Sequence, residues 1–318
     1  MSPSEPVASS PVEGRVADAA AGNWVDHYAP RWMRPYARLA RFDRPIGAWL
    51  LLMPCWWSTL LAQKHVGQTA PNLWFMALFL IGAFVMRGAG CTWNDIVDRD
   101  YDARVRRTAS RPIPSGQVTA RQALVFAVGL CLCGLAVLLQ FNWFTVAVGA
   151  ASLALVAVYP FSKRYTYWPQ VVLGLTFKWG ALVGWAAVTG GLAPAAFALY
   201  AGSVLWTIGY DTIYAHQDKE DDLLLGLKST ALRFGAETYR WLVGFYGGAV
   251  LLWLFAGAFA GSGVAFYVGL AAVSCHLGWQ VATLDIEDAS GCLVRFKSNR
   301  DVGLLLTAAM ALDLVVAG

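Results

Sequence analysis

The sequence contains few charged residues, and long stretches of it contain none. Of its 318 residues only 14% are charged, against about a quarter in an average soluble domain, while 58% are hydrophobic. This composition excludes an ordinary soluble domain. Because the apolar residues form long blocks, we expect an integral membrane protein, with the lipid bilayer as its surroundings and no nucleic acid as a partner.

Metal-binding cysteine patterns and a signal peptide are also missing. The six cysteines lie mostly inside apolar segments, without the spacing of a zinc site. The first residues have no basic stretch followed by an apolar core, and Glu5, Glu13 and Asp18 argue against a mitochondrial presequence. Because this stretch is rich in Ser, Pro, Ala and Gly, we expect a disordered tail over residues 1–30 and a single transmembrane domain over 31–318.

Nine apolar segments follow, and most approach the roughly 20 residues that cross a bilayer as a helix. They are continuous and rich in Leu, Ala, Val and Gly, which favours helices over a barrel of short alternating strands. The last segment is short and contains Asp313. The expected helices cover residues 45–63, 73–93, 123–141, 144–161, 171–188, 194–214, 241–259, 264–284 and 302–316.

Basic residues gather in alternate loops. Arginines are frequent in residues 31–44 and 99–111, and basic residues also follow the fourth, sixth and eighth segments, whereas the intervening loops are short and nearly uncharged. By the positive-inside rule, we expect the basic loops and the N-terminus in the cytoplasm. Almost all ionisable chemistry would then lie at the cytoplasmic face, and we expect a multi-pass protein of a bacterial inner membrane.

Two acidic clusters stand at the ends of apolar segments. The first, NDIVDRDYD at 94–102, places Asn94, Asp98 and Asp102 on one helix face if the second helix continues past Trp93. Arg87 belongs to the same stripe, and Asp95 lies beside it. The second cluster, YDTIYAHQDKEDD, is at 210–222. Its acids Asp211, Asp218 and Asp222 again share one face.

The two clusters are four helices apart, as if a four-helix unit were repeated. Carboxylates and carboxamides at this density suit Mg²⁺, which typically joins a few carboxylates to a substrate phosphate. The neighbouring loops supply arginines and lysines that could hold a diphosphate. We therefore expect a lipid diphosphate as substrate, with its tail in the bilayer. A solvated acidic surface is the plainer interpretation, but two copies at matching positions disfavour it.

Longer motifs surround these acids. RTASRPIPSG at 107–116 follows the first cluster, and GLKSTALRFG at 226–235 follows the second. RFDRPIG at 41–47 stands at the start of the first predicted helix, and YPFSKRY at 159–165 stands at the end of the fourth. From about residue 38 to the C-terminus, the chain resembles the UbiA family of intramembrane prenyltransferases. Its second cluster and the GLKSTALRFG stretch are most similar to the branch that acts on 4-hydroxybenzoate in ubiquinone synthesis.

The resemblance implies a fold of about nine transmembrane helices around a central cavity, built as two four-helix pseudo-repeats plus one helix. It implies a magnesium site formed by Asn94, Asp98, Asp102, Asp218 and Asp222, with Asp95 and Asp211 in support; the four aspartates Asp98, Asp102, Asp218 and Asp222 would be catalytic. Diphosphate-binding residues would be Lys163, Arg107, Arg111, Lys228 and Tyr159. The aromatic carboxylate would be held by Arg164, with Arg41 as a second candidate.

The reaction so implied is the Mg²⁺-dependent transfer of a polyprenyl group from its diphosphate to 4-hydroxybenzoate, at the carbon ortho to the hydroxyl. The ring proton would leave to diphosphate or to an acid such as Asp218. Alternatives are another aromatic acceptor, such as homogentisate or dihydroxynaphthoate, a membrane cation transporter, and a non-catalytic binder of prenyl diphosphates. The position of these acids at helix ends disfavours a transporter, whose sites usually lie near the membrane midplane.

Lys178 does not fit this pattern, because it lies inside the fifth apolar segment. A charge within a membrane helix suggests function. It either faces the site or extends its ammonium toward the membrane surface.

Overall fold

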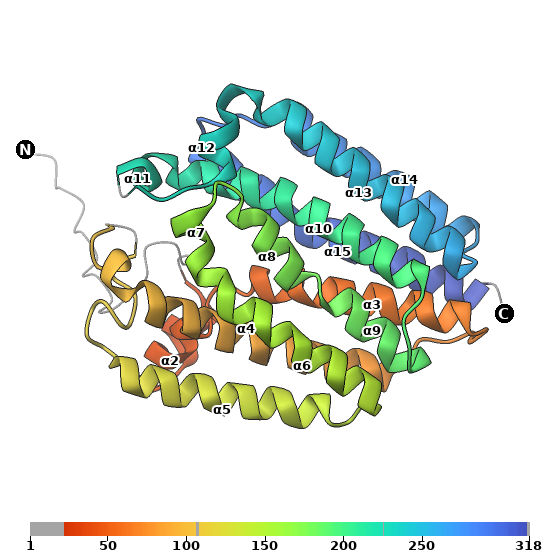
Figure 1. The fold of residues 1–318 in the computed structure, drawn as a ribbon, viewed down its shortest axis with the longest axis horizontal. Coiled ribbons are helices and arrows are strands. Elements are labelled where there is room, and N and C mark those ends of the chain that lie inside the picture. Colours follow the sequence, from red (N-terminus) through yellow and green to blue (C-terminus); the bar gives the residue numbers. More distant parts are fainter. Residues whose placement is uncertain (1–21, 106–107, 225, 317–318) are drawn as a thin grey trace, which may run out of the picture. The chain divides into compact units, whose positions relative to one another are not determined.

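The computed structural model describes residues 22–105, 108–224 and 226–316; within these ranges the side chains of Lys163, Asp218, Glu220, Asp221 and Asp222 lie outside the description. All regular elements in these ranges are helices, which confirms the predicted all-α fold (Figure 1). The chain divides into two compact units, residues 1–45 with 88–130 (unit 1) and residues 46–87 with 131–318 (unit 2), and each is described by itself.

Within the described ranges, a helix occupies each of the nine predicted segments. Seven stretches are long and apolar enough to cross a membrane, and α10 and α15 are not among them. The number of crossings, the orientation of the N-terminus, the pseudo-repeat and the central cavity remain predictions. The long helices are α3 (Ile46–His65), α4 (Leu73–Asp102), α5 (Ala120–Leu138), α6 (Trp143–Val158), α8 (Pro169–Phe177), α9 (Gly180–Thr189), α10 (Pro194–Ala215), α13 (Thr238–Ala260), α14 (Val264–Ala282) and α15 (Ala289–Val316).

Short elements connect these helices. Near the N-terminus, α1 (Trp24–Tyr28) begins after Asn23, whose side chain caps it, so the predicted disordered tail does not hold for these residues. The rest of that tail, residues 1–21, lies outside the described residues. The other short elements are α2 (Arg34–Leu39), η1 (Tyr159–Phe161), α7 (Ser162–Tyr165), η2 (His216–Asp218), α11 (Lys219–Leu224), α12 (Thr230–Phe234) and η3 (Gly235–Glu237).

Unit 1 joins α1, α2, the second half of α4 and the start of α5. Its main apolar cluster places Leu39 of α2 against Val118 and Ala123. Gly88 lets α4 approach the chain end of α2, because a Cβ there would lie 3.0 Å from the Cβ of Ala40. This packing fixes the half of α4 that carries the first acidic cluster.

Unit 2 has an aromatic core in which Trp57, Trp206 and Trp253 pack with ring centroids 5.3–5.7 Å apart. Their indole N–H groups donate to Gly303 and Thr307, to Asn299, and to Ser203, respectively. Each buried donor therefore has a partner, as an apolar environment requires. These contacts hold α3, α10, α13 and α15 together.

Two predicted segments differ in detail from the structure. The segment at 171–188 is broken at Lys178 and Trp179 into α8 and α9. The last helix is longer than predicted and begins at Ala289, because its first half carries charged residues that hide it from a hydropathy pattern. Asp313 lies in α15 without penalty, since it accepts from Gly263 N at 2.9 Å at the start of α14 and pairs with Lys64 at 3.4 Å.

Candidate active site

The first acidic cluster lies on the last turns of α4, which runs unbroken to Asp102. The helix therefore extends beyond its predicted end at Trp93, which meets the condition for the acidic stripe. Asn94 Nδ2 donates to Asp98 Oδ2 at 3.1 Å, so the two side chains share one face, one turn apart. Their amide and carboxylate oxygens are donors of the kind that hard divalent cations prefer.

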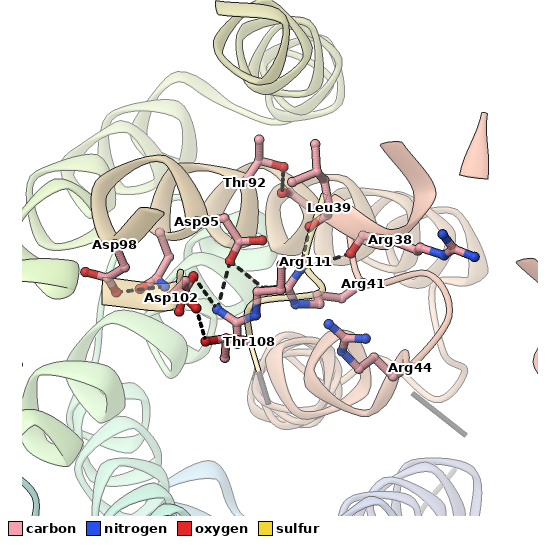
Figure 2. Close-up of polar contacts among 12 residues, drawn as sticks. Arg38, Leu39, Arg41, Arg44, Thr92, Asp95, Asp98, Asp102, Thr108 and Arg111 are labelled. Atoms are coloured by element: carbon pink, nitrogen blue, oxygen red, sulfur yellow. Dashed lines mark hydrogen bonds and ion pairs between the residues drawn. The ribbon is translucent and has the colours of Figure 1, made fainter. Parts of the chain in front are cut away.

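Asp95 has a different role from these neighbours. Its carboxylate is fully buried and accepts from Arg41 Nη2 at 2.6 Å and from Arg111 Nη1 at 3.3 Å (Figure 2). Arg111 Nη1 also lies 2.8 Å from Asp102 Oδ2. Asp95 and Asp102 are two helical turns apart, so one guanidinium bridges both. Within the predicted stripe, Asp98 accepts from Asn94, and Asp102 is paired with Arg111.

The RTASRPIPSG stretch that follows α4 contains two residues, Thr108 and Arg111, that bind back to the end of this helix. Thr108 Oγ1 donates to the carbonyl of Asp102 at 2.8 Å and so satisfies a carbonyl that the end of the helix leaves open. The chain then turns back and brings Arg111 against the acids (Figure 2). Arg107, a predicted diphosphate ligand between these two anchors, lies outside the described residues.

Arg41 enters unit 1 from an unusual backbone position. Its φ is +60°, a left-handed conformation that costs a non-glycine residue about 1 kcal/mol or more. Its guanidinium is held by Asp95 and by the carbonyls of Arg38 and Leu39. This arrangement makes Arg41 a partner of a buried acid. Its predicted role as a holder of the aromatic carboxylate remains untested.

The second acidic cluster continues α10 into η2 and α11 in unit 2. Asp211 is partly buried on α10, one residue after the fully buried Tyr210. The side chains of Asp218 and Asp222, both predicted metal ligands, lie outside the described residues, so their position relative to Asp211 stays a prediction.

The predicted basic residues of unit 2 come from α7 and from the segment before α12, which contact each other. Lys228 Nζ donates to the carbonyl of Tyr165 at 3.3 Å and lies 5.3 Å from the ring of Tyr167. Arg164 directly precedes Tyr165, whose carbonyl Lys228 contacts. The guanidinium of Arg164 packs on the ring of Phe161 at 5.4 Å. Tyr159 is partly buried in η1, at the start of the same segment. The side chain of Lys163 is not among those described.

Local capping places Lys228 in this position. Ser229 caps α12 by accepting from Leu232 N at 3.4 Å, and Thr230 Oγ1 lies 2.7 Å from Thr212 Oγ1 on α10. Thr230 N also donates to Gln170 Oε1 of α8 at 3.2 Å. The GLKST stretch is thus fastened to α8 and α10, which explains its residue types.

Arg87 is a cation that the sequence analysis noted but assigned no role. It lies within the apolar run of α4, where its guanidinium stacks on Phe177 at 4.8 Å. Gly47 faces it closely, since a Cβ there would lie 2.6 Å from Arg87 Nε. That Nε is buried, and no carboxylate among the described residues pairs with Arg87. In the sequence, its position seven residues, or two helical turns, before Asn94 is the pattern that marks Arg87 as a candidate site residue.

His216, between the second cluster and α13, is buried and lies 3.0 Å from Thr238 Oγ1 through Nε2. Burial, together with the nearby charge of Lys219, lowers the pKa of this imidazole to about 4. The charge of Glu287 opposes this shift. His216 is therefore neutral at physiological pH and helps to anchor the end of α10.

The donor set of the described residues is incomplete for a metal ion by itself. No group of three His, Cys, Asp or Glu side chains within the described set is placed to hold one. Asn94 and Asp98 fit Mg²⁺ in chemistry, because both offer hard oxygen donors on one face.

Comparison with known proteins identifies relatives along nearly the whole chain. Residues 51–305 match the model of the UbiA prenyltransferase family. A mitochondrial 4-hydroxybenzoate polyprenyltransferase of Rattus norvegicus is 50% identical over 300 residues, covering 94% of this chain and 79% of that protein. The enzyme of the same name from Caenorhabditis elegans is 50% identical over 279 residues, covering 87% and 78%.

Solved structures share the fold at lower identity. A UbiA homolog from Aeropyrum pernix K1 superposes with a TM-score of 0.67 at 22% identity, covering 85% of this chain and 97% of that one. A UbiA homolog from Archaeoglobus fulgidus, bound to GPP and Mg²⁺, gives a TM-score of 0.63 at 19% identity, covering 89% and 99%. At this identity the likeness establishes the fold.

The relatives correct one prediction. We expected a bacterial inner membrane, but the close relatives from animals and from Arabidopsis thaliana are named as mitochondrial proteins. The multi-pass membrane character holds. With half of its positions identical to these enzymes and the family model matched from 51 to 305, the chain belongs to the UbiA prenyltransferase family.

Proposed function

We propose that this protein transfers a polyprenyl group from polyprenyl diphosphate to the ring carbon ortho to the hydroxyl of 4-hydroxybenzoate, a step of ubiquinone synthesis, and that Mg²⁺ is its metal. The observation that carries the proposal is the 50% identity over 94% of the chain to an enzyme named for this reaction. The all-helical membrane fold agrees with a substrate that has a long apolar tail.

In this proposal Asn94 and Asp98 hold the metal ion, together with Asp218 and Asp222, and Asp211 supports them. The metal, when bound, would supply positive charge for the diphosphate leaving group. Asp102, whose carboxylate Arg111 holds at 2.8 Å, would be a further member of this set at the end of α4. Asp95 supports the site indirectly, because its contacts go to Arg41 and Arg111.

The diphosphate would be bound by the basic residues near the loop contacts described above. Lys228 and the YPFSKRY segment are brought together in unit 2, where Tyr159 and Lys163 belong to the same short stretch. Arg107 and Arg111 would act from the segment after α4, and Arg111 would exchange one of its contacts with Asp95 and Asp102 for the diphosphate. Ammonium and guanidinium groups stabilise the negative charge that grows as the allylic C–O bond breaks.

The acceptor's carboxylate needs a cation that is not already neutralised. Arg41 is committed to Asp95 and to two carbonyls, whereas Arg87 has a buried Nε and no carboxylate partner among the described residues. We therefore add Arg87 as a further candidate for this role, beside the predicted Arg164. With the carboxylate held, the ring carbon ortho to the hydroxyl forms the new C–C bond as the allylic C–O bond breaks and diphosphate leaves. The same ring carbon then loses its proton to the released diphosphate or to an acid such as Asp218.

The reaction is tested with purified protein in lipid, 4-hydroxybenzoate and geranyl diphosphate, with product followed by mass. We expect prenylated hydroxybenzoate that disappears with EDTA and returns with Mg²⁺. Asp98→Ala should lower kcat by about a hundredfold or more, as the loss of a group that stabilises leaving-group charge does. Asp100→Ala, an exposed neighbour on the same helix, is the matched control.

Homogentisate and dihydroxynaphthoate serve as competing acceptors in the same assay. Preference for either of them over 4-hydroxybenzoate would replace the proposed acceptor while leaving prenyl transfer intact. Binding of the diphosphate without any product from the three acceptors would contradict the proposal.

The role of Arg87 has a separate test. Arg87→Met should raise the KM for 4-hydroxybenzoate by about tenfold or more, because a charged hydrogen bond is worth roughly 1.5–3 kcal/mol. The KM for the diphosphate should change little. Arg164→Met is the comparison variant. If the KM for 4-hydroxybenzoate rises in Arg164→Met and not in Arg87→Met, Arg164 is the residue that binds the carboxylate.

A further inference from the structure

Lys178 is a fully buried cation in the middle of a span that has the length and composition of a membrane helix. It stands at the end of α8, where the span breaks before α9 begins. An ammonium group in such a place requires compensation for the water it has lost. Its contacts in unit 2 show how that compensation arises, and none of them is a carboxylate at ion-pair distance among the described residues.

The first contact is with a defect in another helix. Pro54 lies inside α3 and has no N–H, so the carbonyl four residues earlier, that of Leu50, lacks its helical partner. Lys178 Nζ donates to this carbonyl at 2.7 Å. The lysine thus supplies the hydrogen bond that the proline removed, at a depth where water is absent.

The second contact is with α10. The ammonium lies 4.4 Å from the ring of Trp206 and 5.2 Å from the ring of Tyr210, which are one helical turn apart. Trp206 is itself fixed by its indole N–H, which donates to Asn299 Oδ1 at 2.7 Å. A cation over two aromatic faces is attracted by both. Lys178 therefore joins the open carbonyl of α3 to the face of α10 that carries Trp206 and Tyr210, and Asp211 is the next residue after Tyr210.

We propose that Lys178 is a positioning residue of prenyl transfer. It ties the Leu50 carbonyl, which Pro54 leaves without a helical partner, to Trp206 and Tyr210, and so fixes the rotation of α10 that presents Asp211. The proposal rests on the proposed function, in which Asp211 supports the diphosphate site. Lys178 itself touches no substrate. Its contribution is to the orientation of α10 and hence to the affinity for the prenyl diphosphate.

A set of four variants separates this role from a purely structural one. Lys178→Met keeps the length of the side chain but removes the donor and the charge. Pro54→Ala restores an N–H for Leu50, so in Pro54→Ala/Lys178→Met the carbonyl is satisfied while the tie to α10 is still absent. Lys64→Met is the matched control, because Lys64 Nζ also donates to a backbone carbonyl, that of Asp313, at 2.9 Å.

The measurements are the melting temperature, the equilibrium binding of radiolabelled geranyl diphosphate in the presence of Mg²⁺, and the KM values. We expect Lys178→Met to melt at a lower temperature and to bind geranyl diphosphate about tenfold more weakly. In the double variant the melting temperature should recover and the weakened binding should persist. Lys64→Met should lose stability without a change in the dissociation constant.

Binding by Lys178→Met within about twofold of wild type, or binding restored by Pro54→Ala, would overturn the proposal. If Lys178→Met does not fold, the double variant alone decides. Wild-type protein that binds geranyl diphosphate but prenylates none of the acceptors would contradict the proposed function and leave the positioning role to be judged by binding. Failure of wild type to bind geranyl diphosphate would contradict both.

Discussion

Two buried charges, one in each unit, are compensated in opposite ways. Asp95 in unit 1 is a buried acid between two arginines, at 2.6 Å and 3.3 Å. Lys178 in unit 2 is a buried cation that is satisfied by a carbonyl and by two aromatic rings. Asp95 lies in α4 and Lys178 at the end of α8, yet only the first is paired with side chains of opposite charge among the described residues.

The difference follows from where each residue lies along its helix. Asp95 is within the last two turns of α4, where the following loop and the segment before α3 can supply long arginine side chains. Lys178 is far from any such loop, so its partners have to be parts of neighbouring helices: a carbonyl left open by Pro54 and the ring faces of α10. The charge near the end of α4 is paired with opposite charges from adjacent segments. The one deep in a span donates instead to a backbone carbonyl that a proline leaves unpaired.

The largest effect on stability is expected at Asp95. In Asp95→Asn the two arginines, only 10% and 12% exposed, lose their shared carboxylate, and the free energy of unfolding should fall by about 3–5 kcal/mol. Thermal melting in detergent measures this. Asp100→Asn removes an acid that is 75% exposed and should change stability by less than about 1 kcal/mol. Equal losses in both variants would refute the distinction drawn for Asp95.

A smaller effect is expected at Arg41. Arg41→Met leaves Asp95 with Arg111, so the free energy of unfolding should fall by about 1.5–3 kcal/mol, the value of one charged hydrogen bond. The same melting experiment applies. A loss as large as that of Asp95→Asn would mean that Arg111 does not compensate the acid alone.

Asp313 provides a third buried charge, with a lesser expected effect. It pairs with Lys64 and accepts from Gly263 N at the start of α14, so it combines both kinds of compensation. Asp313→Asn keeps an oxygen that can accept the backbone hydrogen bond but removes the charge, and should cost about 1 kcal/mol. An unchanged melting temperature would show that the charge adds nothing to the cap.

The smallest effect is a pH dependence at His216. Since its pKa in the folded protein is lowered to about 4, the unfolded chain takes up a proton between about pH 6.5 and pH 4 that the folded protein does not. Stability should therefore fall as the pH falls through this window. In His216→Gln the drop in melting temperature from pH 7 to pH 5 should be smaller by about 2 °C. No difference between the two proteins in this window would exclude His216 as the source.

The pattern of residues was sufficient to predict the helical class, the apolar segments and the acidic stripe, because hydropathy and helical spacing are local properties. Where charged residues entered a helix, prediction failed: α15 starts thirteen residues before the predicted segment, and the lysine at 178 marks a break that periodicity did not reveal. Residues 24–28, which belong to the predicted tail, form a helix that the side chain of Asn23 caps.

For the candidate site, the sequence by itself determined which residue types gather at the ends of two helices. Only the tertiary structure decided their partners, because Asp95 meets Arg41 across 54 residues and Lys178 meets Leu50 across 128. Spacing along one helix can place Asn94, Asp95 and Asp98 on adjacent faces, but it cannot say which face a distant arginine reaches. That choice is made by packing, since a buried charge is tolerated only where the rest of the chain brings a partner to it.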